Sequence, residues 1–102
     1  MGAAAIVFPR YQSAVLTLAA NATFQEVIRF AGRPSNITIT ASAAGLNFRF
    51  RNRGEEGLDP IRVLAVTPLV LYISKEIVEV QDPGGTGGQI VSAQGGYQDA
   101  DI

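Results

Sequence analysis

The sequence predicts an all-β protein: a single small antiparallel β-sandwich, jelly-roll-like, with about 7–9 short strands. Apolar and polar residues alternate with period two along much of the chain, which is typical of strands that bury one face. Turn residues interrupt the alternation roughly every 8–12 positions, a spacing that favours sandwiches and barrels. We therefore expect one domain over residues 1–102, with residues 1–12 as a candidate N-terminal arm and residues 94–102 as a C-terminal tail.

The two clearest strands lie in the middle of the chain. Residues 36–42 (NITITAS) place their isoleucines on one face and their threonines on the other. Residues 46–52 (LNFRFRN) place their phenylalanines inward and their arginines outward. The Ala-Ala-Gly of residues 43–45 lies between these strands and predicts a hairpin that joins them.

The remaining strands follow from weaker patterns. Residues 60–73 (PIRVLAVTPLVLYI) are apolar on both faces, but Pro60 and Pro68 argue against one long helix, so we divide this run at Pro68. Residues 82–88 (DPGGTGG) are rich in glycine, which predicts a flexible hairpin loop. The other strands are expected at residues 5–8, 13–19, 26–30, 61–66, 69–73, 76–80 and 89–93.

The composition argues against catalysis. The chain has no cysteine, which excludes disulfides and thiolate metal sites. It has no histidine, the commonest general base and metal ligand. The sequence PGGTGG lacks the Lys-Ser/Thr that completes a phosphate-binding loop. We expect no enzymatic activity, no cofactor and no bound metal.

The charges are few and unevenly distributed. The net charge is −1, which argues against a nucleic-acid partner, and the apolar run of residues 64–73 is shorter than the roughly 20 residues that span a membrane. Residues 1–53 carry a net charge of +5 and residues 54–102 a net charge of −6. In a sandwich the two halves of the chain interleave, so these charges either mix on the surface or form a basic and an acidic side.

Two groups of residues are candidates for protein contacts. Arg49, Arg51 and Arg53 alternate along one strand, so they share one face, where they are either solvated or pair with a neighbour's carboxylates. In the later apolar run, the residues expected to face the core are Ile61, Val63, Leu69, Leu71 and Ile73. The residues expected to face outward and to form an apolar contact surface are Leu64, Val66, Val70 and Tyr72.

The layout NITITASAAGLNFRFRNRGEEGLDPIRVLAV resembles the small β-sandwich structural proteins of tailed-bacteriophage virions, of the capsid cement or decoration type. The resemblance extends over residues 26–93. It implies a non-enzymatic protein that is assembled in the host cytoplasm and binds the outside of the capsid. Its partner would be the major capsid protein or another virion protein, and it would stabilise the joints between subunits, often as a homotrimer.

Other functions stay open at this point. A tail or baseplate component is one, because the first residues are apolar and uncharged up to Arg10. A carbohydrate-binding or adhesion module is another, although such a module needs exposed aromatic rings and the chain has no tryptophan and three tyrosines. A subunit of a cellular assembly is the third. Because 47% of the residues are hydrophobic and only 17% are charged, we expect contacts between copies of the chain in any of these settings.

Overall fold

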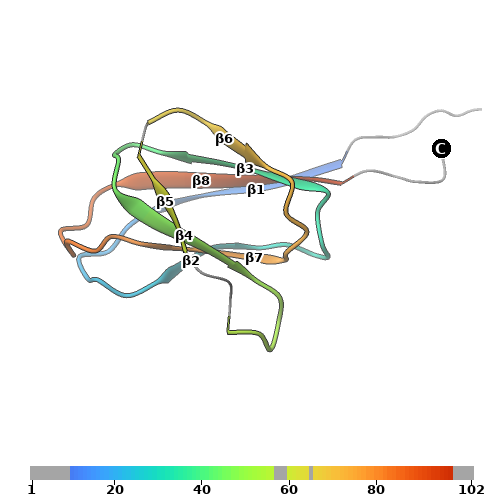
Figure 1. The fold of residues 1–102 in the computed structure, drawn as a ribbon, viewed down its shortest axis with the longest axis horizontal. Coiled ribbons are helices and arrows are strands. Elements are labelled where there is room, and N and C mark those ends of the chain that lie inside the picture. Colours follow the sequence, from blue (N-terminus) through green and yellow to red (C-terminus); the bar gives the residue numbers. More distant parts are fainter. Residues whose placement is uncertain (1–9, 57–59, 65, 98–102) are drawn as a thin grey trace, which may run out of the picture.

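The computed structural model describes residues 10–56, 60–64 and 66–97, which form two packed β-sheets (Figure 1). The strands, in chain order, are β1 (Arg10–Thr17), β2 (Gln25–Arg29), β3 (Asn36–Ala41), β4 (Leu46–Arg51), β5 (Ile61–Val63), β6 (Leu69–Leu71), β7 (Ile77–Gln81) and β8 (Ile90–Tyr97). The first sheet, sheet A, has the order β1-β8-β3-β6, and the second, sheet B, has the order β2-β7-β4-β5. All the strand pairs are antiparallel.

The strand order is that of a jelly roll. The first four strands pair with the last four in reverse: β1 with β8, β2 with β7, β3 with β6, and β4 with β5. A long antiparallel ribbon that is rolled up in this way gives two stacked sheets whose inner faces enclose one core. The predicted fold class, an all-β antiparallel sandwich of jelly-roll-like form, is confirmed.

The core is built from the alternating apolar residues of the strands. In β3 and β4 every second side chain is buried, as the period-two pattern predicts. The central strand β7 is buried along most of its length. Burial of each large side chain contributes about 1.5–3 kcal/mol relative to exposure. The largest fully buried apolar side chains are Phe30, Phe48, Phe50, Ile37, Ile39, Leu46, Ile77, Val78, Val80 and Val91.

The predicted hairpin at residues 43–45 is wrong. Strands β3 and β4 do not pair, because β3 belongs to sheet A and β4 to sheet B. Residues 43–45 instead carry the chain from one sheet to the other. The inward faces of the two strands therefore meet across the core, where the isoleucines of β3 and the phenylalanines of β4 belong to one apolar cluster.

The ends of the described chain also differ from expectation. Residues 10–12 of the candidate arm belong to β1, and residues 94–97 of the expected tail belong to β8, which lies between β1 and β3. The rest of the arm, the strand expected at residues 5–8 and residues 98–102 lie outside the described residues. The glycines of β8 indicate close packing inside a central strand, since a Cβ at Gly95 would lie 2.5 Å from Cε1 of the buried Phe30.

The loop of residues 82–88 is not the flexible hairpin that its glycines predict. It passes from β7 in sheet B to β8 in sheet A, and the buried carboxylate of Asp82 holds it in place. The backbone amides of Gly84, Thr86 and Gly87 donate to this carboxylate over 3.0–3.3 Å, and Gln89 donates from its side chain. Burial by itself raises the pKa of Asp82, but these hydrogen bonds outweigh burial and lower the pKa below its ordinary value.

Candidate interaction surface

The apolar residues that were expected to face outward are exposed. The exposed fractions of Leu64, Val66, Val70 and Tyr72 lie between 52% and 87%. Of the residues expected in the core, Val63 is buried, and Ile61, Leu71 and Ile73 pack against the core while partly exposed. Leu69 is the exception, because it is 38% exposed in an edge strand that has a neighbour on one side alone.

The structure places these exposed residues in two locations. Leu64 and Val66 lie between β5 and β6, where the chain passes from the edge of sheet B to the edge of sheet A. Leu69 at the start of β6 is exposed as well, and we call these three apolar residues the β5–β6 rim. Val70 pairs with Thr38 of β3 and projects from the outer face of sheet A, and Tyr72 follows directly after β6.

The predicted arginine stripe forms ion pairs within the chain. Nε and Nη2 of Arg49 donate to Oε1 of Glu79 over 2.9 and 2.6 Å. Nε of Arg51 lies 3.3 Å from the other carboxylate oxygen of Glu79, Oε2. Nε of Arg53 lies 3.8 Å from Oε1 of Glu76. Each arginine thus has a carboxylate partner on β7 or just before it, and pairing with a neighbouring protein stays a prediction.

These ion pairs also answer the question of charge distribution. The arginines come from the positive first half of the chain, and Glu76 and Glu79 come from the negative second half. The guanidinium of Arg49 in addition lies 3.9 Å from the centre of the Phe24 ring. The charges of the two halves mix on the outer face of sheet B, where they partly neutralise one another.

The outer face of sheet A has a different composition. Along each strand of sheet A, the residues that alternate with the buried ones point outward. We call the surface that they form the sheet A face. It consists of Tyr11, Ser13, Val15 and Thr17 of β1, Ile90, Ser92, Gln94 and Gly96 of β8, Asn36, Thr38 and Thr40 of β3, and Val70 of β6. None of these residues is charged. The face therefore offers hydroxyl, amide and apolar groups alone.

The edges of the two sheets differ in the same way. In sheet B, edge strand β2 has an irregular register between Glu26 and Ile28 and an ion pair of 2.8 Å between Glu26 and Arg29. Edge strand β5 has only three residues, and the middle one is an exposed arginine. Bulges, charges and short length are the features that prevent edge strands from associating. Edge strand β1 of sheet A has eight residues and carries exposed Tyr11 and Val15.

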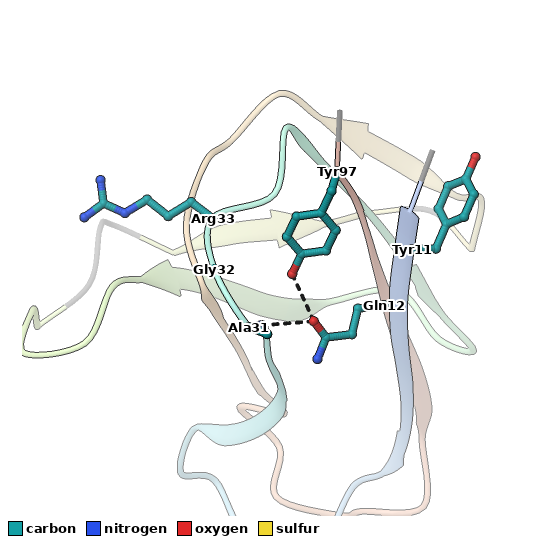
Figure 2. A pocket seen from close by; sticks show the side chains of 6 residues that line it. All are labelled: Tyr11, Gln12, Ala31, Gly32, Arg33 and Tyr97. Atoms are coloured by element: carbon teal, nitrogen blue, oxygen red, sulfur yellow. Dashed lines mark hydrogen bonds between the residues drawn. The ribbon is translucent and has the colours of Figure 1, made fainter. Parts of the chain in front are cut away.

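A surface depression of about 430 Å³ lies beside the start of β1, lined by Tyr11, Gln12, Ala31, Gly32, Arg33 and Tyr97. Oε1 of Gln12 accepts hydrogen bonds from the Tyr97 hydroxyl over 2.9 Å and from the Ala31 amide over 3.0 Å. Figure 2 shows Tyr11 and Arg33 pointing away from each other on opposite sides of this depression. Gln12, Tyr97 and Ala31 bond to one another, and the side chains of Tyr11 and Arg33 point away, so the depression lacks the convergent ligand-directed groups that a small-molecule site needs.

Acidic side chains do not gather into a metal site in the described part of the chain: no group of three or more potential ligands lies together there. Within the same residues, we find no helix with the length and hydrophobicity that crossing a membrane requires.

No protein-family model and no curated protein matches this sequence. One solved structure, described as "Bacillus endospore appendages form a novel family of disulfide-linked pili", has a similar fold. The TM-score is 0.54 at 10% sequence identity, and the match covers 96% of this chain and 98% of that chain. At this identity the similarity shows the fold alone. One difference is plain from the sequence: this chain has no cysteine with which to form a disulfide.

Proposed function

We propose that this chain is a non-enzymatic structural subunit that assembles with copies of itself into an open polymer. The observation that carries the proposal is the β5–β6 rim, where Leu64, Val66 and Leu69 are exposed together at one side of the sandwich. Exposed apolar surface of this kind marks contacts between proteins. The match to a pilus protein over nearly the whole of both chains supports the proposal through the fold that the two share.

The positions of the rim and of strand β1 favour a head-to-tail contact. The strand orders place β5 and β6 at one side of the sandwich and β1 and β2 at the other. A contact between two different surfaces of identical subunits generates either a closed ring or an open filament. We therefore expect the rim of one copy to pack against the β1 side of the next, without covalent links because the chain has no cysteine.

The setting of such a polymer stays a prediction. The resemblance to virion proteins implies a capsid partner and a trimer, whereas the fold shared with a pilus protein supports a filament. These alternatives differ in stoichiometry, since a capsid-binding trimer is closed and a filament is open.

Light scattering coupled to size exclusion, followed by negative-stain electron microscopy, tests the proposal. We expect a mass that rises with concentration above the 10.8 kDa of one chain, and filaments in the images. A fixed mass near three subunits supports the closed trimer instead. A monomer at every concentration contradicts self-assembly altogether.

A variant with Leu64→Asp and Val66→Asp tests the role of the rim. Two carboxylates at an apolar contact must be desolvated on assembly, so this variant is expected to stay monomeric. The matched control carries Ser35→Asp and Ser74→Asp, which add the same charge at exposed positions that belong neither to the rim nor to β1. If both variants assemble as the original chain does, the rim is not the contact.

A further inference from the structure

Two exposed tyrosines lie in one row across the sheet A face. Tyr11 of β1 is opposite Gly96 of β8, and Gly96 is opposite Asn36 of β3. Ile37 is opposite Leu71, the last paired residue of β6, and Tyr72 follows Leu71 directly. Extending this register by one residue would bring Tyr72 to the level of Asn36. With strands about 4.8 Å apart, the ends of this row are separated by roughly three strand spacings, or about 14 Å.

Both rings are available to a ligand. The side chain of Tyr11 is 62% exposed and that of Tyr72 is 87% exposed, the largest exposure among the exposed apolar and aromatic residues. Figure 2 shows Tyr11 on the opposite side of β1 from Gln12, which points toward the depression and binds Tyr97. Tyr11 therefore belongs to the sheet A face and is not held in the depression.

Between the two rings the surface is low and polar. Gly96 has no side chain, and a Cβ at this position would lie 3.0 Å from Oδ1 of Asn36, so the Asn36 amide lies directly over the glycine. Gln94 and Thr38 follow in the adjacent row, opposite each other. In the part of the chain that the structure describes, the side-chain amides of Asn36 and Gln94 form no hydrogen bond with the protein. Their donors and acceptors are free to bind a ligand.

The absence of charge restricts the class of ligand. A face without ionised groups gives no compensation for the desolvation of a phosphate, a carboxylate or a cation. A neutral ligand with many hydroxyl groups and flat apolar patches matches both the amides and the tyrosine rings. Neutral sugars have this chemistry: their axial C–H groups pack on aromatic rings, and their hydroxyls bond to amides.

We propose that the sheet A face binds a neutral polysaccharide, with sugar rings stacked on Tyr11 and Tyr72 and with hydroxyls bonded to Asn36 and Gln94. The inference goes beyond self-assembly and does not depend on it, because a single chain contains the whole row. The small number of aromatic residues argued against a carbohydrate module, but the fold brings two of the three tyrosines into one row.

Affinity gel electrophoresis of the full chain tests this inference. The probes are three soluble neutral polysaccharides, hydroxyethyl cellulose, dextran and galactomannan, with heparin as a charged comparison. We expect retardation in at least one neutral gel and none in heparin. No retardation in any neutral gel, or retardation in heparin alone, overturns the proposal.

Variants at the tyrosines show whether the retardation arises from the row. Tyr11→Ala and Tyr72→Ala are each expected to weaken binding roughly tenfold, which corresponds to about 1.4 kcal/mol. Tyr11→Phe and Tyr72→Phe keep the stacking surface and are expected to retain most of the binding. Circular dichroism verifies that each variant is folded. Binding that survives both alanine substitutions overturns the assignment.

Two further proteins separate this proposal from the proposed polymer. Leu64→Ala removes an exposed apolar side chain away from the row and is expected to leave retardation unchanged. The double variant with Leu64→Asp and Val66→Asp is expected to be a monomer that still binds through the row. If that monomer fails to bind while the assembled chain binds, the site is formed between subunits and the row of a single chain is not sufficient.

Discussion

The two sheets use their outer faces differently although they share one core. On sheet B, arginines and glutamates bind each other: Glu79 accepts hydrogen bonds from Arg49 and forms an ion pair with Arg51. On sheet A the face is uncharged, and Tyr11, Tyr72 and the side-chain amides near them stay exposed or half-buried. Sheet B is therefore occupied by contacts within the chain, whereas sheet A is available for contacts with other molecules. The comparison teaches that a stripe of arginines can be neutralised within its own chain, so such a stripe does not by itself indicate an interface.

The largest expected effect concerns the centre of sheet A. Gly95→Ala places a Cβ 2.5 Å from the ring of Phe30, a buried residue that has little room to move. We expect a loss of about 3 kcal/mol in the free energy of unfolding, measured by urea denaturation, because overpacking of this kind displaces ring or backbone. The matched control is Gly96→Ala, whose Cβ meets the movable end of the Asn36 side chain and is expected to cost about 1 kcal/mol. Equal losses would show that the ring of Phe30 does not restrict this strand.

In sheet B, the folding stability is expected to depend on the ion pairs that Glu79 forms with Arg49 and Arg51. Glu79→Gln removes a carboxylate that is mostly buried and leaves Arg49 and Arg51 without their partner. We expect a loss of about 2 kcal/mol in the free energy of unfolding. The control, Glu26→Gln, breaks an exposed pair with Arg29 and is expected to cost less than about 0.5 kcal/mol. A high-salt titration should reduce the small effect more than the large one.

Acid is expected to weaken the loop that joins β7 to β8. The folded-state pKa of Asp82 lies below its ordinary value of 3.8, so the unfolded chain binds this proton more readily than the folded chain does. The stabilisation is therefore complete above the ordinary pKa and is lost as the pH falls through the lower folded pKa. Denaturation curves between pH 6 and pH 2 should show this loss, and Asp82→Asn should make the curve flatter over that range.

Glu55 also has a lowered pKa, so its contribution to the loss of stability in acid must be distinguished from that of Asp82. The backbone amide of Asn52 donates to Glu55 and is the main cause of its lowered pKa, and Lys75 adds a side-chain hydrogen bond. Glu55→Gln is therefore expected to remove another part of the acid dependence. If neither variant flattens the curve, other carboxylates account for the loss of stability in acid.

The smallest effect on folding is expected at the edge of sheet A. Val15→Lys places a charged side chain on edge strand β1, as Glu26 and Arg29 do on edge strand β2. Because Val15 is exposed, the free energy of unfolding should change by less than about 0.5 kcal/mol. Association, measured by light scattering, should nevertheless decrease, since a charged edge strand opposes pairing with another chain. Unchanged association would exclude the exposed edge of β1 as the surface that the β5–β6 rim contacts.

Local sequence patterns predicted which side chains face inward but not which strands pair. The period-two pattern was sufficient for the buried residues of β3 and β4 and for the exposure of Leu64 and Tyr72, because alternation is a property of one strand. The hairpin at residues 43–45 failed because strand pairing depends on segments far apart in the chain. Residues 36 and 96 are neighbours in sheet A, for example.

The candidate sites also depend on contacts between distant segments, which local sequence patterns do not indicate. The Arg49–Glu79 ion pair joins residues 30 positions apart, and no local pattern indicates it. The row from Tyr11 to Tyr72 needs the register of three strand pairs, each of which is long-range. From the sequence alone, Gly95 and Gly96 suggest a flexible tail. The groups that require glycine at these positions, the Phe30 ring and the Asn36 amide, come from distant segments of the chain.

The pairing of the first strand with the last has a mechanical consequence. Residues 10 and 97 are opposite each other in an antiparallel pair, so both ends of the described chain leave the sandwich at the same end (Figure 1). A force that pulls these ends apart would unzip the β1–β8 ladder one hydrogen bond at a time, which is the weak direction of such a pair. In a filament that runs from the β5–β6 rim to the β1 side, tension would act across the strands and load all the hydrogen bonds of a ladder together, whereas a load through the termini would break them one after another.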